Sequence, residues 1–309
     1  MAQYQEIIND IRGLRIQGAI NVAKAAVDAF EIKLDELFND PEKSDIKILV
    51  KELLDVKKEL FGLRSTEPAL RNAVGYLFVN IKYTTEPKVI KDIFADNITY
   101  VRKHFSDAKE TINRLGAKRI GDGSKIFTHC HASTVTGAII SAKNKNKKII
   151  VHNTETRPLF QGRKTAEELS ENGIEVVHFV DSAGRLALKN CDLMLIGADA
   201  ILSDGTIINK IGSEMFAEIA KRYDTSVYIC TDSWKFDPAS LYGDDEKIEM
   251  RDEKEIWDKK PKNVTIKNYA FEKINPGLIN GIICELGIFK PEVFVSEVLE
   301  NYPWMKDII

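Results

Sequence analysis

Residues 125–143 read KIFTHCHASTVTGAIISAK, in which a short apolar run leads through small hydroxyl residues into a helical segment. The same order recurs further along the chain. Apolar runs begin at Lys148, Glu175, Leu193 and Val227, and helical segments at about 166–172, near 186 and at 215–222 separate them. Strands that alternate with helices need right-handed crossovers and a parallel sheet that is covered on both faces. The pattern therefore predicts a doubly wound α/β domain over residues 117–309.

The first part of the chain is predicted to be helical. Apolar residues spaced by threes and fours run from Ile90 to Leu115 and form one stripe on a long helix. Pro87 stands near the first turn of this helix, where proline is tolerated. Residues 46–60 also have the pattern of an amphipathic helix, and no segment before Gly116 has the pattern of a strand. We expect a helical N-terminal domain over residues 1–116.

The composition is that of an ordinary globular protein, with 44% apolar and 29% charged residues. The net charge of −3 gives no reason to expect a nucleic acid or a membrane surface as a partner. The first residues, MAQYQEIINDIRGL, lack the apolar core of a signal peptide, and no run approaches the ~18 apolar residues of a spanning helix. The four cysteines form no C-x-x-C pair, which argues against a zinc site or a disulfide framework. We expect a cytoplasmic protein.

Ionisable residues follow the predicted strands, and in open parallel sheets ligands bind beyond the carboxyl ends of the strands. Cys130 follows the first strand and precedes a helix whose dipole can favour its thiolate, although most lone cysteines are buried and inert. Asp199 follows the run LMLIGA, where an unpaired buried carboxylate would be costly; alternatively, it is a cap or turn acid. These two residues are candidates for an acid–base pair. His129 and His131 flank the cysteine, but no second cluster completes a metal site, so we expect them to pack or form hydrogen bonds.

Basic residues near the same edge of the sheet are candidates for phosphate binding. Asn209 and Lys210 lie in a short loop before a predicted helix, whose first backbone amides would suit a phosphate. Arg157 and Lys235 also follow strands. An exposed basic residue in a loop is usually only solvated, so the pattern alone leaves both interpretations open.

An ordered set of motifs resembles one known superfamily. The motifs are THCHAS, TETRPxxQGRxTA, DSA, GADAI, DGxxxNKIG and SWKFDP, with RIQGAINVAKAA and RSTEPALRNA nearer the N-terminus. They resemble the superfamily of ribose-1,5-bisphosphate isomerase, methylthioribose-1-phosphate isomerase and the regulatory subunits of initiation factor 2B. The resemblance covers nearly the whole chain and implies a helical N-terminal domain followed by a Rossmann-like α/β catalytic domain.

The retained Cys130 and Asp199 indicate the enzyme branch, since the regulatory subunits typically replace one or both. THCH, TETRP, SWKFDP and the EMRD segment at residues 249–252 are closer to the archaeal-type ribose-1,5-bisphosphate isomerases. The resemblance thus implies conversion of ribose 1,5-bisphosphate to ribulose 1,5-bisphosphate, with Cys130 as base and Asp199 as acid. Methylthioribose-1-phosphate isomerase and a non-catalytic regulatory subunit remain the alternatives.

The resemblance also implies a set of substrate-binding residues. They are Gln17, Gly18, Ala19, Ile20, Arg64, Ala132, Ser133, Thr134, Arg157, Asn209, Lys210 and Lys235. Enzymes of this type usually have an arginine where this chain has Gln17, and glutamine cannot replace the charge of a bidentate phosphate contact. Arg15 is the candidate to compensate. No metal and no cofactor are expected, activation by AMP is left open, and the expected partners are a sugar phosphate and further copies of the chain, as a dimer or a hexamer.

Overall fold

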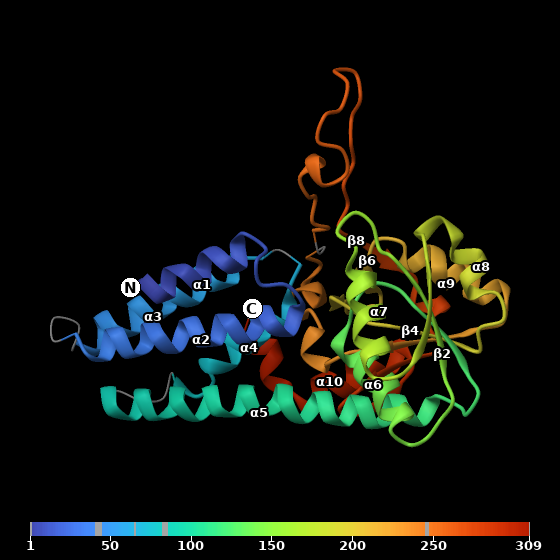
Figure 1. Cartoon of the computed structure of the whole chain (residues 1–309). Coiled ribbons are helices and arrows are strands. Elements are labelled where there is room, and N and C mark those ends of the chain that lie inside the picture. The colour runs from blue at the N-terminus through green and yellow to red at the C-terminus, as the bar shows by residue number, and fades with distance from the viewer. Residues whose placement is uncertain (1, 41–44, 65, 82–85, 245–246, 309) are drawn as a thin grey trace.

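The fold is divided between a helical half and a sheet half (Figure 1). The computed structural model describes residues 2–40, 45–64, 66–81, 86–244 and 247–308. The helical half consists of α1 (Ala2–Arg12), α2 (Ala19–Phe38), α3 (Ile46–Phe61), α4 (Pro68–Leu77) and α5 (Pro87–Arg119). Among the described residues no strand precedes Lys125. The predicted fold class, a helical region followed by an α/β region, is confirmed.

A seven-stranded sheet forms the centre of the second half. Its order from edge to edge is β10 (Gly287–Phe289), β9 (Gly281–Cys284), β7 (Ser226–Cys230), β4 (Leu193–Ile196), β1 (Lys125–Thr128), β2 (Ile150–Thr154) and β3 (Glu175–Phe179). Within it, β10 runs antiparallel to β9 and the other pairs are parallel. The chain builds outward from β1 to β3 and then returns to place β4 on the other side of β1. The crevice between β1 and β4 is therefore the topological switch point, where doubly wound sheets bind their ligands.

Helices connect the strands much as the sequence predicts. They are α6 (Ser133–Lys143), α7 (Gln161–Glu171), α8 (Gly184–Leu188) and α9 (Ser213–Arg222), and α10 (Pro291–Asn301) follows the last strand. Short 3₁₀ helices lie at Asp181–Ala183 (η3), Ser233–Lys235 (η4), Pro238–Tyr242 (η5), Glu253–Glu255 (η6), Pro276–Leu278 (η7) and Pro303–Asp307 (η8).

A second, small sheet was not predicted. It contains β5 (Ala200–Ile201), β6 (Ile207–Lys210) and β8 (Phe271–Ile274), in the order β5-β6-β8. Asn209 and Lys210, expected in a loop, are instead the last residues of β6, and they pair antiparallel with Glu272 and Phe271. The correction matters for the site, because a strand holds these two side chains more firmly than a loop would.

Helix α5 joins the two halves of the molecule, and Figure 1 shows it lying along both of them. The predicted apolar stripe on this helix is buried from Ile90 to Ile112, as expected of one long helix. Phe94 and Phe105 belong to a core cluster that also contains Phe127 of β1. One apolar core thus spans both halves. The helix continues to Arg119, past the predicted domain boundary at residue 116.

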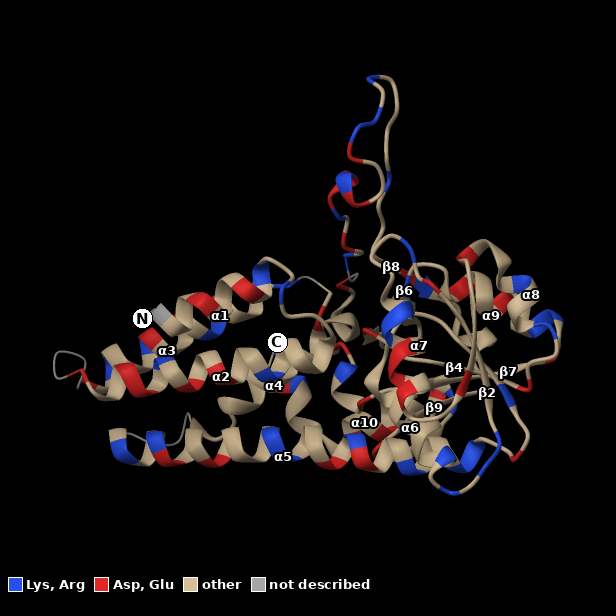
Figure 2. Ribbon diagram, viewed as in Figure 1, with Lys and Arg blue, Asp and Glu red and all other residues tan. Residues whose placement is uncertain are grey.

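The described residues between η5 and β8 form a long arm that leaves the sheet half (Figure 1). Figure 2 shows basic and acidic residues interspersed along the helices and the arm. Within the described residues, no helix is both long enough and apolar enough to cross a membrane.

Candidate active site

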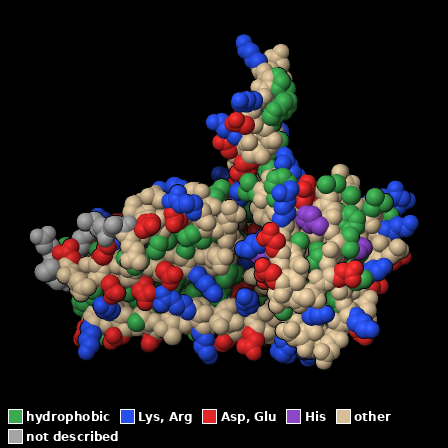
Figure 3. All heavy atoms as spheres, in the orientation of Figure 1, with side chains coloured by type: hydrophobic (Ala, Val, Ile, Leu, Met, Phe, Trp, Pro, Cys, Tyr) green, Lys and Arg blue, Asp and Glu red, His purple; other side chains and the backbone are tan. Residues whose placement is uncertain are grey.

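A cavity opens at the carboxyl end of the sheet, at the switch point between β1 and β4. It measures about 1060 Å³ including its open mouth. Both halves contribute to its wall, because the start of α2 and the turn before α4 face the residues that follow β1 and β4. Figure 3 shows the molecule hollowed between the two halves. A cavity at a switch point and between two parts of a chain is the default place for a small-molecule site.

Cys130 lies on the cavity wall, two residues after the end of β1. Its backbone is left-handed, with φ 65°, a conformation that is uncommon outside glycine and clusters at functional sites. Two hydrogen bonds hold that backbone: its N–H donates to Thr156 Oγ1 at 2.9 Å, and its carbonyl accepts from Thr165 Oγ1 at 2.8 Å. Burial raises the pKa of the Cys130 thiol to about 11, although the charge of Lys210 lowers it. At neutral pH the group is therefore a thiol in the free protein, and the role of Cys130 as a base stays a prediction.

Asp199 lies on the wall after β4, and its backbone N–H donates to the carbonyl of Ile208 in β6 at 2.8 Å. Burial raises the pKa of the Asp199 carboxyl, while the positive charges of Lys235, Lys210 and Arg64 lower it. A carboxyl whose pKa is raised by burial can keep a proton closer to neutral pH than a solvated one. Asp199 lies on the cavity wall, and its role as an acid stays a prediction.

The cavity wall carries more positive than negative side chains. Among the described lining residues, Arg64, Lys164, Lys210, Lys235 and Arg251 stand against Glu67 and Asp199. Lys235 Nζ donates to the carbonyl of Ala198 at 2.6 Å, and Lys210 Nζ lies 4.7 Å from the ring centroid of Phe271. Neither interaction neutralises a lysine, so both charges remain for a ligand. The excess suits an anionic ligand.

Residues 17–20 bring the start of α2 to the cavity. Gly18 has φ 88°, which lets the chain turn into the helix at this point. Gln17 is exposed, and its Nε2 donates to the carbonyl of Leu14 at 3.0 Å. Arg15 is not among the described lining residues, and its guanidinium pairs with Asp10. Arg15 therefore does not supply the missing charge, and this part of the wall is uncharged.

Thirteen of the fourteen predicted site residues line the cavity. They are Cys130, Asp199, Gln17, Gly18, Ala19, Ile20, Arg64, Ala132, Ser133, Thr134, Asn209, Lys210 and Lys235. Arg157 is the exception among the described residues: its exposed guanidinium lies 5.0 Å from the ring centroid of Phe160, and its backbone N–H donates to Asp181. The placement of Arg157 at the site is therefore corrected. The contacts that the other residues make with a substrate stay predictions.

Comparison with known proteins identifies the family. A model of the Initiation factor 2 subunit family matches residues 15–291. The chain belongs to that family. A ribose 1,5-bisphosphate isomerase of Pyrococcus furiosus is 35% identical over 97% of this chain and 94% of its own length. A methylthioribose-1-phosphate isomerase of Thermosipho melanesiensis is 29% identical over 93% of this chain and 87% of its own.

The structures agree with the family assignment. The crystal structure of the translation initiation factor eIF-2B of Pyrococcus horikoshii OT3 matches with a TM-score of 0.80 and 28% identity, over 93% of this chain and 97% of that one. Over nearly its whole length, this chain is thus similar to proteins named as enzymes and to one named as a translation factor. The fold alone does not identify the function, which has to be inferred from the residues of the cavity.

Nine further residues line the cavity without having been predicted as site residues. They are Asn21, Glu67, His131, Gln161, Lys164, Gly197, Ala198, Arg251 and Phe271. Gln161 and Arg251 belong to the quoted motifs QGR and EMRD, so their motif membership was a usable signal. Two lining side chains keep a buried oxygen without a hydrogen-bond partner among the described residues, namely Oε2 of Glu67 and Oε1 of Gln161. Buried polar atoms are normally paired, so these two are available to a ligand or to water.

His129 fixes the wall rather than lining it. Its Nε2 can only donate to the carbonyl of Ile211, at 3.0 Å, so Nδ1 accepts from Thr154 Oγ1 at 2.6 Å. Burial lowers the pKa of His129 to about 4, which keeps the ring neutral. The neutral ring ties the loop after β6 to β2, and the expectation of hydrogen bonding agrees with these contacts.

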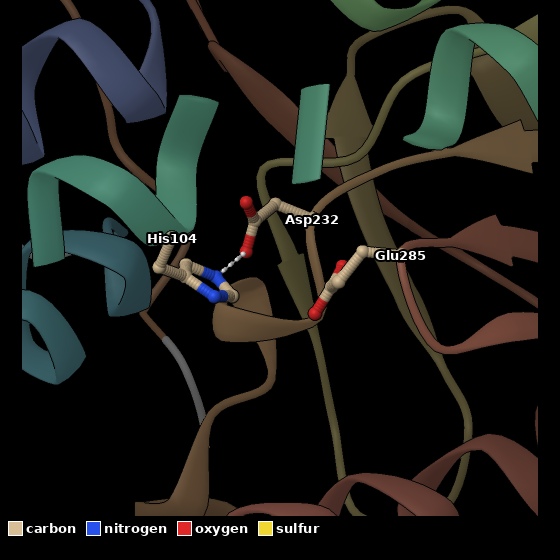
Figure 4. A group of neighbouring side chains, drawn as sticks. All are labelled: His104, Asp232 and Glu285. Carbon is tan, nitrogen blue, oxygen red and sulfur yellow. Dashed lines mark hydrogen bonds and ion pairs between the residues drawn. The ribbon is translucent and has the colours of Figure 1, made fainter. Parts of the chain in front are cut away.

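A second cluster of titratable groups lies where α5 meets the strand ends of β7 and β9 (Figure 4). Nε2 of His104 lies 3.0 Å from Oδ1 of Asp232, which also accepts from the backbone N–H of Trp234 at 2.9 Å. Glu285 accepts from the backbone N–H of Ser233 at 3.1 Å. Ligand atoms of His104, Asp232 and Glu285 lie within 4.8 Å of one another, a spacing that a metal site would share. The hydrogen bonds already account for the cluster as a clamp between the two halves.

This clamp predicts a pH-dependent stability. Burial lowers the pKa of His104, but the charge of Asp232 and its hydrogen bond more than offset this, and the pKa is raised overall. Protonated His104 therefore stabilises the folded state. This contribution is complete below the ordinary histidine pKa, and it is lost as pH rises through the raised pKa of His104. We expect His104→Asn to lower the stability by about 1–3 kcal/mol at pH 6 and by less at pH 9. Melting temperatures at both pH values measure it, with His178→Asn on the exposed edge strand β3 as the control; an equal loss at both values would contradict the clamp.

Proposed function

We propose that this protein isomerises ribose 1,5-bisphosphate to ribulose 1,5-bisphosphate. The observation that carries the proposal is the placement of a thiol and a carboxyl, Cys130 and Asp199, after the adjacent strands β1 and β4 in a cavity with an excess of positive charge. The relatives that are named ribose 1,5-bisphosphate isomerase support the same reaction, at up to 35% identity over nearly the whole chain.

The reaction moves hydrogen from C2 to C1 of the opened sugar, and one base and one acid are sufficient for it. Cys130 takes the C2 proton and returns it to C1, while Asp199 gives a proton to one sugar oxygen and recovers one from another. The working form therefore has a thiolate together with a protonated carboxyl. Because burial raises the thiol pKa to about 11, this form is the minor one in the free protein. The charge of Lys210, and then the backbone N–H of His131, lower the thiol pKa. Such proton transfers need no metal and no redox cofactor.

The basic residues of the wall would bind the phosphates. The ammonium groups of Lys210 and Lys235 form no ion pair with a carboxylate among the described contacts. Lys164 lines the same wall. Arg64 is partly committed, since its Nη2 donates to Glu249 at 3.0 Å. Two phosphates carry more negative charge than one, so a second phosphate is bound well only if enough of these cations face it.

The uncharged start of α2 gives a testable consequence for affinity. We expect Gln17→Arg to lower the KM for ribose 1,5-bisphosphate about tenfold with little change in kcat, because a charge-assisted hydrogen bond contributes ~1.5–3 kcal/mol. Steady-state kinetics of the two proteins measure the effect. Gln17→Met is the control for side-chain length without charge. A KM that stays the same in Gln17→Arg would show that residue 17 does not face a phosphate.

The same feature favours one alternative. Methylthioribose 1-phosphate has a neutral substituent where the second phosphate would be, and an uncharged wall would accept it. Isomerisation of both sugar phosphates by the purified protein, with and without AMP, tests the proposal and the activation by AMP. Turnover of the bisphosphate supports the proposal. Turnover of the monophosphate alone would indicate a methylthioribose-1-phosphate isomerase, and no turnover of either would favour a regulatory subunit.

We also propose that the protein assembles as a dimer or a hexamer and that it is cytoplasmic. Light scattering measures the assembly.

A further inference from the structure

Glu67 is a buried carboxyl on the cavity wall that is only partly paired. It is 2% exposed and stands directly before Pro68, at the start of α4, yet its side chain makes no capping hydrogen bond to that helix. Its Oε1 forms a long ion pair with Arg64 Nη2 at 3.5 Å, and the same nitrogen donates a hydrogen bond to Glu249 at 3.0 Å. Its Oε2 has no hydrogen-bond partner among the described residues. Burying a carboxylate in this way is costly unless the group is neutralised or used.

We propose that Glu67 is a positioning residue that acts through Asp199, the two carboxyls forming a pair that retains one proton in the cavity. The inference rests on the proposed isomerase function, in which Asp199 must be protonated to serve as the acid. Both carboxyls line the same cavity, and Oε2 of Glu67 is buried there without a hydrogen-bond partner among the described residues. Two carboxyls in one buried cavity cannot both ionise easily, so one proton is held to higher pH than either group alone would hold it.

The charges around the pair show why a second carboxyl is needed. Asp199 faces three cations, Lys235, Lys210 and Arg64, and each of them favours its ionised form. Burial, the largest influence, still keeps the pKa of Asp199 above its ordinary value, and the cations work against it. Burial, and then the charge of Asp199, raise the pKa of Glu67 to about 8, so a second carboxyl in the same cavity helps to retain a proton there.

Further charged groups act on Glu67 from the other packed elements. Arg64 in the turn before α4 and Lys235 in η4 lower its pKa, and Glu249 at the base of the arm raises it.

Proton transfer through the pair is balanced over a turnover. Asp199 gives a proton to a substrate oxygen and recovers one from another oxygen, so the pair returns with the one proton it began with.

A sharp test is the pH dependence of kcat/KM in Glu67→Gln, which keeps the size of the side chain and removes its titration. The thiol pKa is about 11 and the Glu67 pKa is about 8, so the form with a thiolate and a protonated carboxyl is most populated between these values. The limb of the profile near pH 8 therefore reports the proton on the carboxyls. We expect this limb to move to lower pH by about one unit or more in the variant. Each unit by which the carboxyl pKa falls lowers tenfold the fraction of the protein that has both a thiolate and a protonated carboxyl. The maximum of kcat/KM therefore falls tenfold for each unit.

Two results would overturn the proposal. One is a lower maximum with the limb in place, which a merely structural defect would give. The other is an equal shift in Glu255→Gln, the matched control, which removes a carboxylate that pairs with the cavity residue Arg251 but does not line the cavity among the described residues. Glu67→Asp should restore part of the shift.

An infrared measurement separates this proposal from the proposed function. The wild-type protein at pH 7 should show the carbonyl stretching band of a protonated carboxyl, and the band should weaken in Glu67→Gln. If the band behaves so while neither sugar phosphate is turned over, the proton-sharing pair stands and the proposed substrate fails. If turnover occurs and the band is absent from the wild-type protein, the proposed function stands and the pair fails.

Discussion

Replacing Cys130 by serine is expected to lower kcat for ribose 1,5-bisphosphate about 10³-fold, within the range that general acid–base groups contribute. A serine hydroxyl is a far weaker acid than a thiol, so it does not form the base that takes the C2 proton. The variant should fold normally, because the left-handed turn at residue 130 is held by its backbone: Thr156 Oγ1 accepts from its N–H and Thr165 Oγ1 donates to its carbonyl. Loss of activity with an unchanged melting temperature is therefore the expected result.

Cys191→Ser is the matched control for this experiment. Cys191 is buried outside the cavity, and its Sγ donates to the carbonyl of Ala187 at 3.1 Å, a contact that a hydroxyl can also make. We expect kcat to be unchanged in this variant. A Cys130→Ser protein that retains wild-type kcat would contradict the assignment of Cys130 as the base and would transfer that role to another wall residue.

The sheet was predictable from the sequence to the extent that its strands are apolar and separated by helices. The runs at Lys125, Glu175 and Leu193 became β1, β3 and β4 with the expected starts. β6 was missed because IINK ends in two polar residues, although it pairs antiparallel with β5 across a turn that contains Asp204-Gly205, a local hairpin signal. Its second partner, β8, lies about sixty positions later, and no local pattern reveals that pairing.

The candidate site was predictable where one physical rule placed it. Cys130 and Asp199 follow strands, and the rule that ligands bind beyond the carboxyl ends of parallel strands indicates both without further knowledge. Gln17 and Arg64 came from the resemblance alone, because helical periodicity does not show which end of the helical half meets the sheet. Glu67 belongs to the quoted motif RSTEPALRNA, but its local pattern is that of an ordinary residue before a helix-starting proline, and it was not predicted as a site residue. That it is buried beside Asp199 depends on the docking of α4, which only the structure shows.

Asp199→Asn is expected to lower kcat by about 10²–10⁴-fold, because the amide cannot give a proton to one sugar oxygen and recover a proton from another. Although it loses activity, the variant should not lose stability at neutral and higher pH. The pKa of Asp199 is raised in the folded protein, so its contribution to stability is present at low pH and is lost as pH rises above its ordinary value. The melting temperature of the variant should therefore equal or exceed that of the wild type at pH 8. Asp204→Asn, in the exposed turn after β5, is the control for both measurements.

Combining the variants decides whether Asp199 and Glu67 act as a unit. If the two carboxyls share one proton, removing Asp199 already abolishes the acid step, and adding Glu67→Gln should lower kcat little further. Losses that multiply would mean that the two residues act independently, with Glu67 contacting the substrate in its own right. An Asp199→Asn protein that keeps most of its activity, together with a Glu67→Gln protein that loses it, would assign the acid to Glu67, whose Oε2 is the carboxyl oxygen left without a partner among the described residues. In each case the proton belongs to the wall between β4 and α4, and the variants decide which oxygen delivers it.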